Sequence, residues 1–278
     1  MKYMLTIYLP AVLLTASCIR PIGMTEAPSP RALQPKSPIL LTSVQRTKIA
    51  RKIWRNESNE TIDGLTAWNE GEGFPSLGIG HFIWYPKGVN GPFTESFPQF
   101  IAFAKQQGIT PPVLARYADA PWSSRQEFKS QFNSPQMVEL RNWLANNLTL
   151  QADFIITKSL SSLGKIINAT SPADRARVHA NYQKVAATPN GQYALIDYVN
   201  FKGEGINPKE RYNGQGWGLL QVLLNMQNVP SGQPAAAEFA TSAKRTLGQR
   251  IANSPKERGE KRWKSGWFNR CATYAQPL

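Results

Sequence analysis

The segment "SLGIGHFIWYP" (residues 76–86) sets two glycines one residue apart at the start of a run that otherwise has the character of a strand. Four large apolar residues follow His81, and Pro86 ends the run. This pattern predicts a short strand that closes in a turn. Because a glycine inside a strand is typical of a close approach between the backbone and another group, we expect something to lie directly against Gly78 and Gly80.

The segment before it, "TSVQRTKIARKIWRNES" (residues 42–58), has a helical period. Ile49, Ile53 and Glu57 recur at steps of four, so they lie on one stripe of a helix. A polar residue at position 42 or 43 can cap the start of this helix. We therefore expect Glu57 to end an apolar stripe, where its carboxylate is partly removed from water.

Most of the later sequence also has helical spacing and helix-capping residues. We predict a mainly α protein with a small β-hairpin (α+β), in which one domain spans residues 42–278. The expected helical segments lie within residues 96–108, 134–147, 148–167, 171–187, 192–205, 217–228 and 235–253.

The first 18 residues have the pattern of an export signal, with one lysine, an apolar run from Tyr3 to Leu14 and small residues before Cys18. The run is shorter than the roughly 20 apolar residues that span a bilayer, which favours a signal peptide over a membrane helix. "LTASC" resembles a bacterial lipobox, which would make Cys18 a lipidated residue; an ordinary cleaved signal is the alternative. Both predict export, and we expect a periplasmic lipoprotein held to a membrane by its lipid alone.

Residues 19–41 are rich in proline and small polar residues and have no helical or strand period, which predicts a linker between the signal and the folded domain. The other cysteine of the chain is Cys271. It is a lone thiol if Cys18 carries lipid, and a candidate disulfide partner of Cys18 otherwise.

The chain is strongly basic, with 32 Lys and Arg against 18 Asp and Glu and a formal net charge of +14. Such a charge favours a polyanionic partner: nucleic acid, anionic lipid or a cell-wall polymer that bears carboxylates. An exported chain seldom meets nucleic acid, so we do not expect nucleic-acid binding. Because the basic residues are scattered, a solvated face is the simpler interpretation of the same charge.

Familiar metal and cofactor motifs are missing from the sequence. The two histidines, His81 and His179, are far apart and have no metal-ligand spacing. No phosphate-binding loop, dinucleotide-binding glycine motif or G-x-S-x-G nucleophile turn occurs. We expect neither a metal nor a cofactor.

Carboxylates are the remaining candidates for chemistry, and five of them fall within sixteen residues: Glu57, Glu60, Asp63, Glu70 and Glu72. Two carboxyl groups in different environments can cleave a glycosidic bond, because one stays protonated as general acid while the other stays ionised. Glu57 on its apolar stripe fits the acid, and Glu70 or Glu72 on a glycine-flanked loop fits the ionised partner. Loop charges that serve solubility alone are the alternative.

The order of these features resembles the start of phage-type lysozymes, in which a helix ending at a glutamate is followed by a hairpin carrying T-I-G-I-G-H or T-I-G-Y-G-H. The later stretches at residues 194–223 and 253–267 are also similar to that family. The resemblance implies a lysozyme-like fold and a catalytic Glu57. It places Ser76 at the family's threonine and Glu70 at its aspartate, with Glu72 close enough to compete. It also suggests that the two glycines lie against the helix of Glu57 or against a bound sugar.

Further residues are expected near the substrate. His81 is first interpreted as a structural histidine hydrogen-bonded under the hairpin, and an acid/base group is the alternative. A glycine-rich turn near residue 210 concentrates polar and aromatic side chains, and glycine-rich loops also bring two tryptophans near the substrate groove. The predicted substrate-binding residues are His81, Trp84, Glu210, Tyr212, Gln215 and Trp217.

Together these features predict an exported, monomeric enzyme that cleaves the glycan strand of peptidoglycan, a muramidase-type glycoside hydrolase with a glutamate general acid. Two alternatives remain open. One is a lytic transglycosylase that needs a single glutamate. The other is a non-catalytic lipoprotein that binds the cell wall on the same scaffold.

Overall fold

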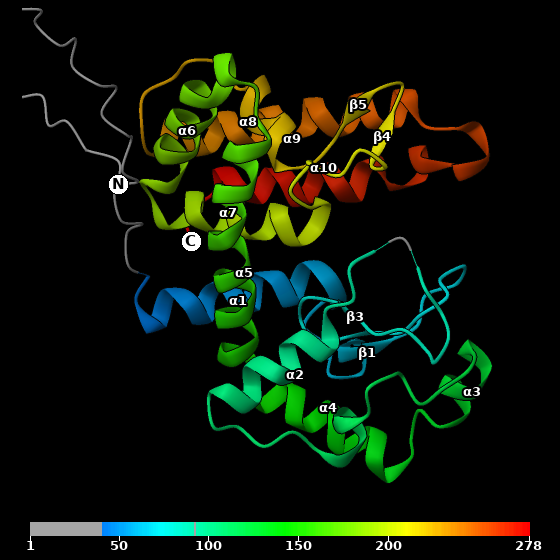
Figure 1. Ribbon diagram of the computed structural model, residues 1–278. Coiled ribbons are helices and arrows are strands. Elements are labelled where there is room, and N and C mark those ends of the chain that lie inside the picture. The colour runs from blue at the N-terminus through cyan, green and yellow to red at the C-terminus, as the bar shows by residue number, and fades with distance from the viewer. Residues whose placement is uncertain (1–40, 92) are drawn as a thin grey trace, which may run out of the picture. The chain divides into compact units, whose positions relative to one another are not determined.

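The computed structural model describes residues 41–91 and 93–278, which all belong to one unit of the chain (Figure 1). The predicted signal segment, Cys18 and nearly all of the predicted linker lie outside the described residues. Among the described helices, none combines the length and the apolar character needed to cross a membrane.

The described chain is mainly helical with two small antiparallel sheets, which confirms the predicted α+β class. The α-helices are α1 (Ser43–Ser58), α2 (Phe97–Gln106), α3 (Arg125–Ser130), α4 (Pro135–Asn146), α5 (Leu148–Ala169), α6 (Pro172–Ala186), α7 (Pro189–Lys202), α8 (Leu219–Asn225), α9 (Gln233–Asn253) and α10 (Lys264–Ala272). Short 3₁₀ turns are η1 (Asp63–Leu65), η2 (Val113–Arg116), η3 (Lys256–Arg258), η4 (Glu260–Trp263) and η5 (Thr273–Ala275).

Five very short strands form the sheets: β1 (Thr66–Ala67), β2 (Ser76–Leu77), β3 (Phe82–Ile83), β4 (Arg211–Tyr212) and β5 (Gln215–Gly216). The first three pair in the order β1-β2-β3, and β4 pairs with β5. The predicted strand at residues 76–86 is thus a tight hairpin with a third strand beside it. The glycine-rich turn near residue 210, which is expected to line the substrate groove, forms a second hairpin.

Helix α5 connects two groups of elements in Figure 1. The sheet β1–β3 lies near one end of α5 with α2, α3 and α4, and α6 to α10 gather toward the other end. Helix α1 packs against α5 and also contacts α7. The last turn of α1 therefore lies where the sheet group and the helical group come together (Figure 1).

Local sequence explains why α1 forms where it does. The Thr42 side chain accepts a hydrogen bond from the Gln45 backbone, and the Gln45 side chain accepts one from the Thr42 backbone, which makes a reciprocal cap. Ile49 and Ile53 are fully buried, so the predicted apolar stripe is the packed face. The helix ends where Asn59 takes a left-handed conformation, which leaves Glu57 in the last turn.

The two glycines of the opening segment lie against α5. The Ile79 amide donates to Gln151 Oε1 at 2.9 Å, and a Cβ added to Gly78 would come within 2.3 Å of that same oxygen. A Cβ on Gly80 would approach Ile155, one turn further along α5, at 3.0 Å. The close approach that the sequence predicts is present, but the expectation that the helix of Glu57 or a sugar occupies it is wrong, because α5 does.

Gly78→Ala is expected to lower the free energy of unfolding by about 2 kcal/mol, because the new Cβ meets Gln151 and strains a residue whose φ is +72°. Urea denaturation measures this loss. Gly71→Ala is the matched control, since Gly71 also has a positive φ of +81° but no atom within 4 Å of an added Cβ. Equal losses in the two variants would contradict the importance of the contact with α5.

Candidate active site

Glu57 sits among three groups from other elements, and its side chain is only 14% exposed. Arg270 Nη2, from α10, donates to Glu57 Oε1 at 2.7 Å, and Asn200 Nδ2, from α7, donates to the same oxygen at 3.4 Å. The second oxygen lies 3.5 Å from His81 Nδ1. The last turn of α1 thus meets the glycine hairpin on one side and the helical group on the other.

Arg270 joins Glu57 to a second, fully buried carboxylate. Its Nε and Nη2 donate to the two oxygens of Asp197 at 2.8 Å each, and Tyr274 adds a hydrogen bond from its hydroxyl at 2.6 Å. The guanidinium also lies 4.1 Å from the ring centre of Phe201. A buried Arg–carboxylate pair with this many hydrogen bonds is held in one geometry, so the position of Glu57 is fixed by α7 and α10 together.

The electrostatic setting of Glu57 differs from the sequence expectation. Burial raises the pKa of Glu57, but Arg270, His81 and Lys202 together hold this pKa below its ordinary value. Glu57 is therefore ionised in the unliganded protein. The expectation that an apolar stripe keeps it protonated is wrong, because a buried guanidinium lies beside the carboxylate.

His81 lies directly against the catalytic candidate. It has a φ of 46°, and its amide donates to the carbonyl of Gly78 at 3.2 Å, which closes the tight turn of the hairpin. Its Nδ1 faces Glu57, while its Nε2 is buried with no hydrogen-bond partner among the described residues. The imidazole therefore makes no hydrogen bond to the described residues under the hairpin of the kind that the sequence prediction expects, and it lies against Glu57 instead.

Glu72 has the opposite electrostatic setting to Glu57. It is half-buried, and Trp68 and Asn69 hold its loop by hydrogen bonds to the Glu72 carbonyl at 2.7 Å and carboxylate at 3.2 Å. Burial raises the pKa of Glu72, and Asn69 and His81 only partly offset this. His81 thus acts on the pKa of both carboxyls.

Glu70 and Ser76, the other two residues predicted on this side of the site, make no hydrogen bond to Glu57. Glu70 is exposed and makes no hydrogen bond to the described residues, so Glu72 is the better candidate for the second carboxyl group. Ser76 is buried on β2, where it pairs with Ala67 and Ile83, and no hydrogen bond joins its hydroxyl to Glu57.

A second cluster forms on the hairpin β4–β5. Tyr212 donates to Glu260 at 2.9 Å, and Arg250 makes two hydrogen bonds to the same carboxylate at 2.8 and 2.7 Å. The Arg250 guanidinium lies 4.1 Å from the ring centre of Trp217, whose ring centre is 4.7 Å from that of Tyr212. The structure therefore brings Tyr212 and Trp217 together, but the packing leaves Trp217 only 8% exposed.

The remaining predicted residues of this region border that cluster, since Gln215 pairs with Tyr212 in the hairpin and Arg250 acts on the pKa of Glu210. Gln215 on β5 accepts a hydrogen bond from Asn253 at 3.2 Å. Glu210 is half-buried near the start of the hairpin, and burial raises its pKa against the opposing effects of Asn207 and Arg250. Neither residue contacts Glu57.

The expectation that Trp84 contacts a sugar is wrong. Trp84 has no exposed surface, its ring packs against Phe97 and Trp122, and its Nε1 donates to the carbonyl of Ala118 at 3.2 Å. Aromatic residues dominate protein cores, and the apolar run that contains Trp84 is part of the core here.

Several residues of the site were not found from the sequence: Asp197, Asn200, Arg250, Glu260 and Arg270. Asp197 had a usable signal, because it is the one charged residue in the apolar stretch "YALIDYV" (residues 193–199). A buried charge of this kind demands a partner of opposite sign. Nothing in the sequence identifies that partner as Arg270, 73 positions later.

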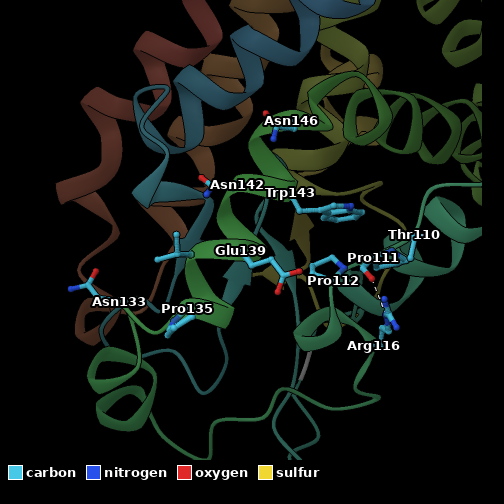
Figure 2. A pocket seen from close by; sticks show the side chains of 11 residues that line it. Thr110, Pro111, Pro112, Arg116, Asn133, Pro135, Glu139, Asn142, Trp143 and Asn146 are labelled. Carbon is cyan, nitrogen blue, oxygen red and sulfur yellow. Dashed lines mark hydrogen bonds between the residues drawn. The ribbon is translucent and has the colours of Figure 1, made fainter.

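A hollow elsewhere on the surface contains none of the predicted residues. Figure 2 shows the side chains that line it, among them Glu139, Asn142 and Trp143 from α4 and Arg116 from η2. It holds no pair of carboxylates with opposed pKa shifts. In the part of the chain that the structure describes, no group of His, Cys, Asp and Glu is suited to hold a metal ion.

The chain matches no family model, and no curated protein or solved structure matches it.

Arg270→Met is expected to lower the free energy of unfolding by about 3–5 kcal/mol, because it leaves the buried Asp197 carboxylate without its cation. Urea denaturation measures the loss, and Arg262→Met, at an exposed arginine, is the control expected to stay within about 0.5 kcal/mol of the parent. The double variant Arg270→Met/Asp197→Leu should recover part of the loss. A small effect of Arg270→Met alone would contradict the buried pairing.

Proposed function

We propose that this chain is an exported peptidoglycan-cleaving enzyme, a muramidase-type glycoside hydrolase on a lysozyme-like fold, anchored to a membrane through lipidated Cys18. One observation carries the proposal. Glu57 and Glu72 have pKa values shifted in opposite directions, and His81 acts on the pKa of both. Carboxyl groups whose environments separate their pKa values are typical of acid and base partners in glycoside cleavage.

The two environments assign the roles. Glu72 keeps its proton to higher pH, so it donates to the bridging oxygen of the glycosidic bond. Glu57, held ionised beside Arg270, faces the positive charge that develops on the sugar or activates a water. This order is the reverse of the sequence prediction, in which Glu57 is the general acid.

The arrangement of elements supports the same proposal. Helix α1 carries Glu57 in its last turn, a small sheet with the glycine hairpin follows it, and the long helix α5 connects this sheet to a helical group. The helix that carries Glu57 and the glycine hairpin after it are the features in which the sequence resembles phage-type lysozymes. The net charge of +14 suits a glycan whose peptides bear carboxylates.

Glu57→Gln is expected to reduce the clearing of a cell-wall suspension by at least about 100-fold, because the ionised carboxylate beside the reacting sugar is lost. Turbidity loss measures the rate, and circular dichroism checks that the variant is folded. Glu70→Gln is the matched control, since Glu70 is exposed and makes no hydrogen bond to the described residues, and it should keep most of its activity. A fully active Glu57→Gln protein would contradict the proposal.

The division of roles is tested with an aryl glycoside of a chitin oligosaccharide whose leaving group needs no protonation. Glu72→Gln is expected to retain most of its activity on this substrate while losing at least about 100-fold on peptidoglycan. Its remaining rate should fall only on the acidic side, as pH drops through the lowered pKa of Glu57. If Glu57→Gln is the variant rescued by this substrate, Glu57 is the proton donor and the assigned roles are reversed.

Mass spectrometry of cell-wall digests identifies the reaction class. A hydrolase releases fragments with reducing sugar ends. Anhydro-sugar ends would instead indicate a lytic transglycosylase, and sedimentation with cell wall without any released fragment would indicate a binding protein.

A further inference from the structure

Lys202, the last residue of α7, places its ammonium between two aromatic rings. Its Nζ lies 3.5 Å from the ring centre of Trp267 and 3.9 Å from that of Phe201. Among residues 41–91 and 93–278, no side chain or carbonyl forms a hydrogen bond or ion pair with it. The residue is only partly exposed, and Nζ is not among the fully buried side-chain atoms that lack a partner.

The other cations near Lys202 are already paired. Arg250 is bound by Glu260, and Arg270 is bound by Asp197 and Glu57. The charged groups that act on Lys202 are therefore two engaged guanidiniums and the carboxylates of Glu260 and Glu57. Burial and the two arginines lower the pKa of Lys202 well below its usual range.

Beside this ammonium is a face that suits a sugar. Trp263 and Trp267 stack with their ring centres 5.7 Å apart, and Trp263 is 38% exposed. An exposed indole presents an apolar face with a polar edge, which is well suited to a sugar ring. Trp267 connects this ring pair to the ammonium of Lys202, and the Arg262 guanidinium lies 4.6 Å from the ring centre of Trp263.

We propose that Lys202 is a binding site for a carboxylate of the substrate, next to the reacting position at Glu57. The proposal rests on the proposed function, because it takes peptidoglycan as the molecule that occupies this region. The carboxylate would pair with Lys202. Of the three cations Lys202, Arg250 and Arg270, only Lys202 has no acidic partner among the described residues. Charge-assisted hydrogen bonds between an ammonium and a carboxylate are about twice as strong as neutral hydrogen bonds, and they add specificity for an acidic glycan.

Binding has a further consequence for protons. A carboxylate beside Lys202 favours the charged ammonium, which burial and the arginines disfavour in the free protein. Occupation of the site therefore takes up protons from solution at any pH at which the free amine has lost its proton, up to about one for each carboxylate bound.

The test measures binding of peptidoglycan by sedimentation in the cold, in the Glu72→Gln background to slow cleavage. Two ligands are compared: native peptidoglycan and the same material with its carboxylates converted to methylamides. Lys202→Met keeps an aliphatic stem between the rings but removes the charge. It is expected to weaken binding to the native polymer by about tenfold and to change binding to the amidated polymer little.

Lys264→Met is the matched control, because Lys264 on α10 also lies over an aromatic ring, at 5.4 Å from the centre of Phe268, and is exposed. It should bind both polymers like its parent. Should Lys202→Met fold poorly by circular dichroism, Lys202→Gln takes its place. Calorimetry in two buffers of different ionisation enthalpy reports the proton uptake, which should disappear with Lys202.

Binding that is unchanged in Lys202→Met would overturn the proposal, and so would an equal loss for both polymers, which is what a merely structural lysine would give. Failure of the proposed function has a different signature. The parent protein could release no fragment and yet bind the native polymer more tightly than Lys202→Met does. That result would support the carboxylate site and contradict the assignment as an enzyme.

Discussion

The guanidinium of Arg270 is the group on which the arrangement of the site depends. It is buried, and its donors reach Asp197 on α7 and Glu57 at the end of α1, so one side chain of α10 ties three helices to each other. A buried cation can be stable only with such partners, because its removal from water costs several kcal/mol that hydrogen bonds and opposite charge must offset. The carboxylate of Glu57 is thus part of the buried pairing as well as of the candidate chemistry.

The same guanidinium sets the charges around it. Its positive charge lowers the pKa of Glu57 and also that of Lys202. It therefore favours the ionised form of Glu57 and disfavours the charged form of Lys202. Glu72, on the loop before β2, owes its raised pKa chiefly to burial. One buried cation and one partly buried loop are enough to separate the protonation of two glutamates fifteen positions apart in the chain.

The spacing of residues close together in the sequence correctly predicted local features of the fold. The four-residue spacing of Ile49, Ile53 and Glu57 predicted α1 and its packed face, and the paired glycines predicted a close approach of the hairpin. What lies across each contact was not predictable, because it is set by tertiary packing: α5 lies against the glycines and Arg270 lies beside Glu57. Apolar neighbours in sequence indicate that a side chain is buried. They do not indicate which charge is buried with it.

The fold nevertheless links these two contacts. Gln151, near the start of α5, accepts from the amide of Ile79 and donates to the carbonyl of Leu144 at 2.7 Å, so the hairpin is fixed to the junction of α4 and α5. Two residues after Ile79 the chain turns through His81, whose left-handed backbone aims Nδ1 at Glu57. The glycines are therefore needed for the geometry of the candidate site, although they do not contact Glu57 themselves. They let the hairpin approach α5 closely enough that its next side chain meets the end of α1, where Arg270 holds the carboxylate in place.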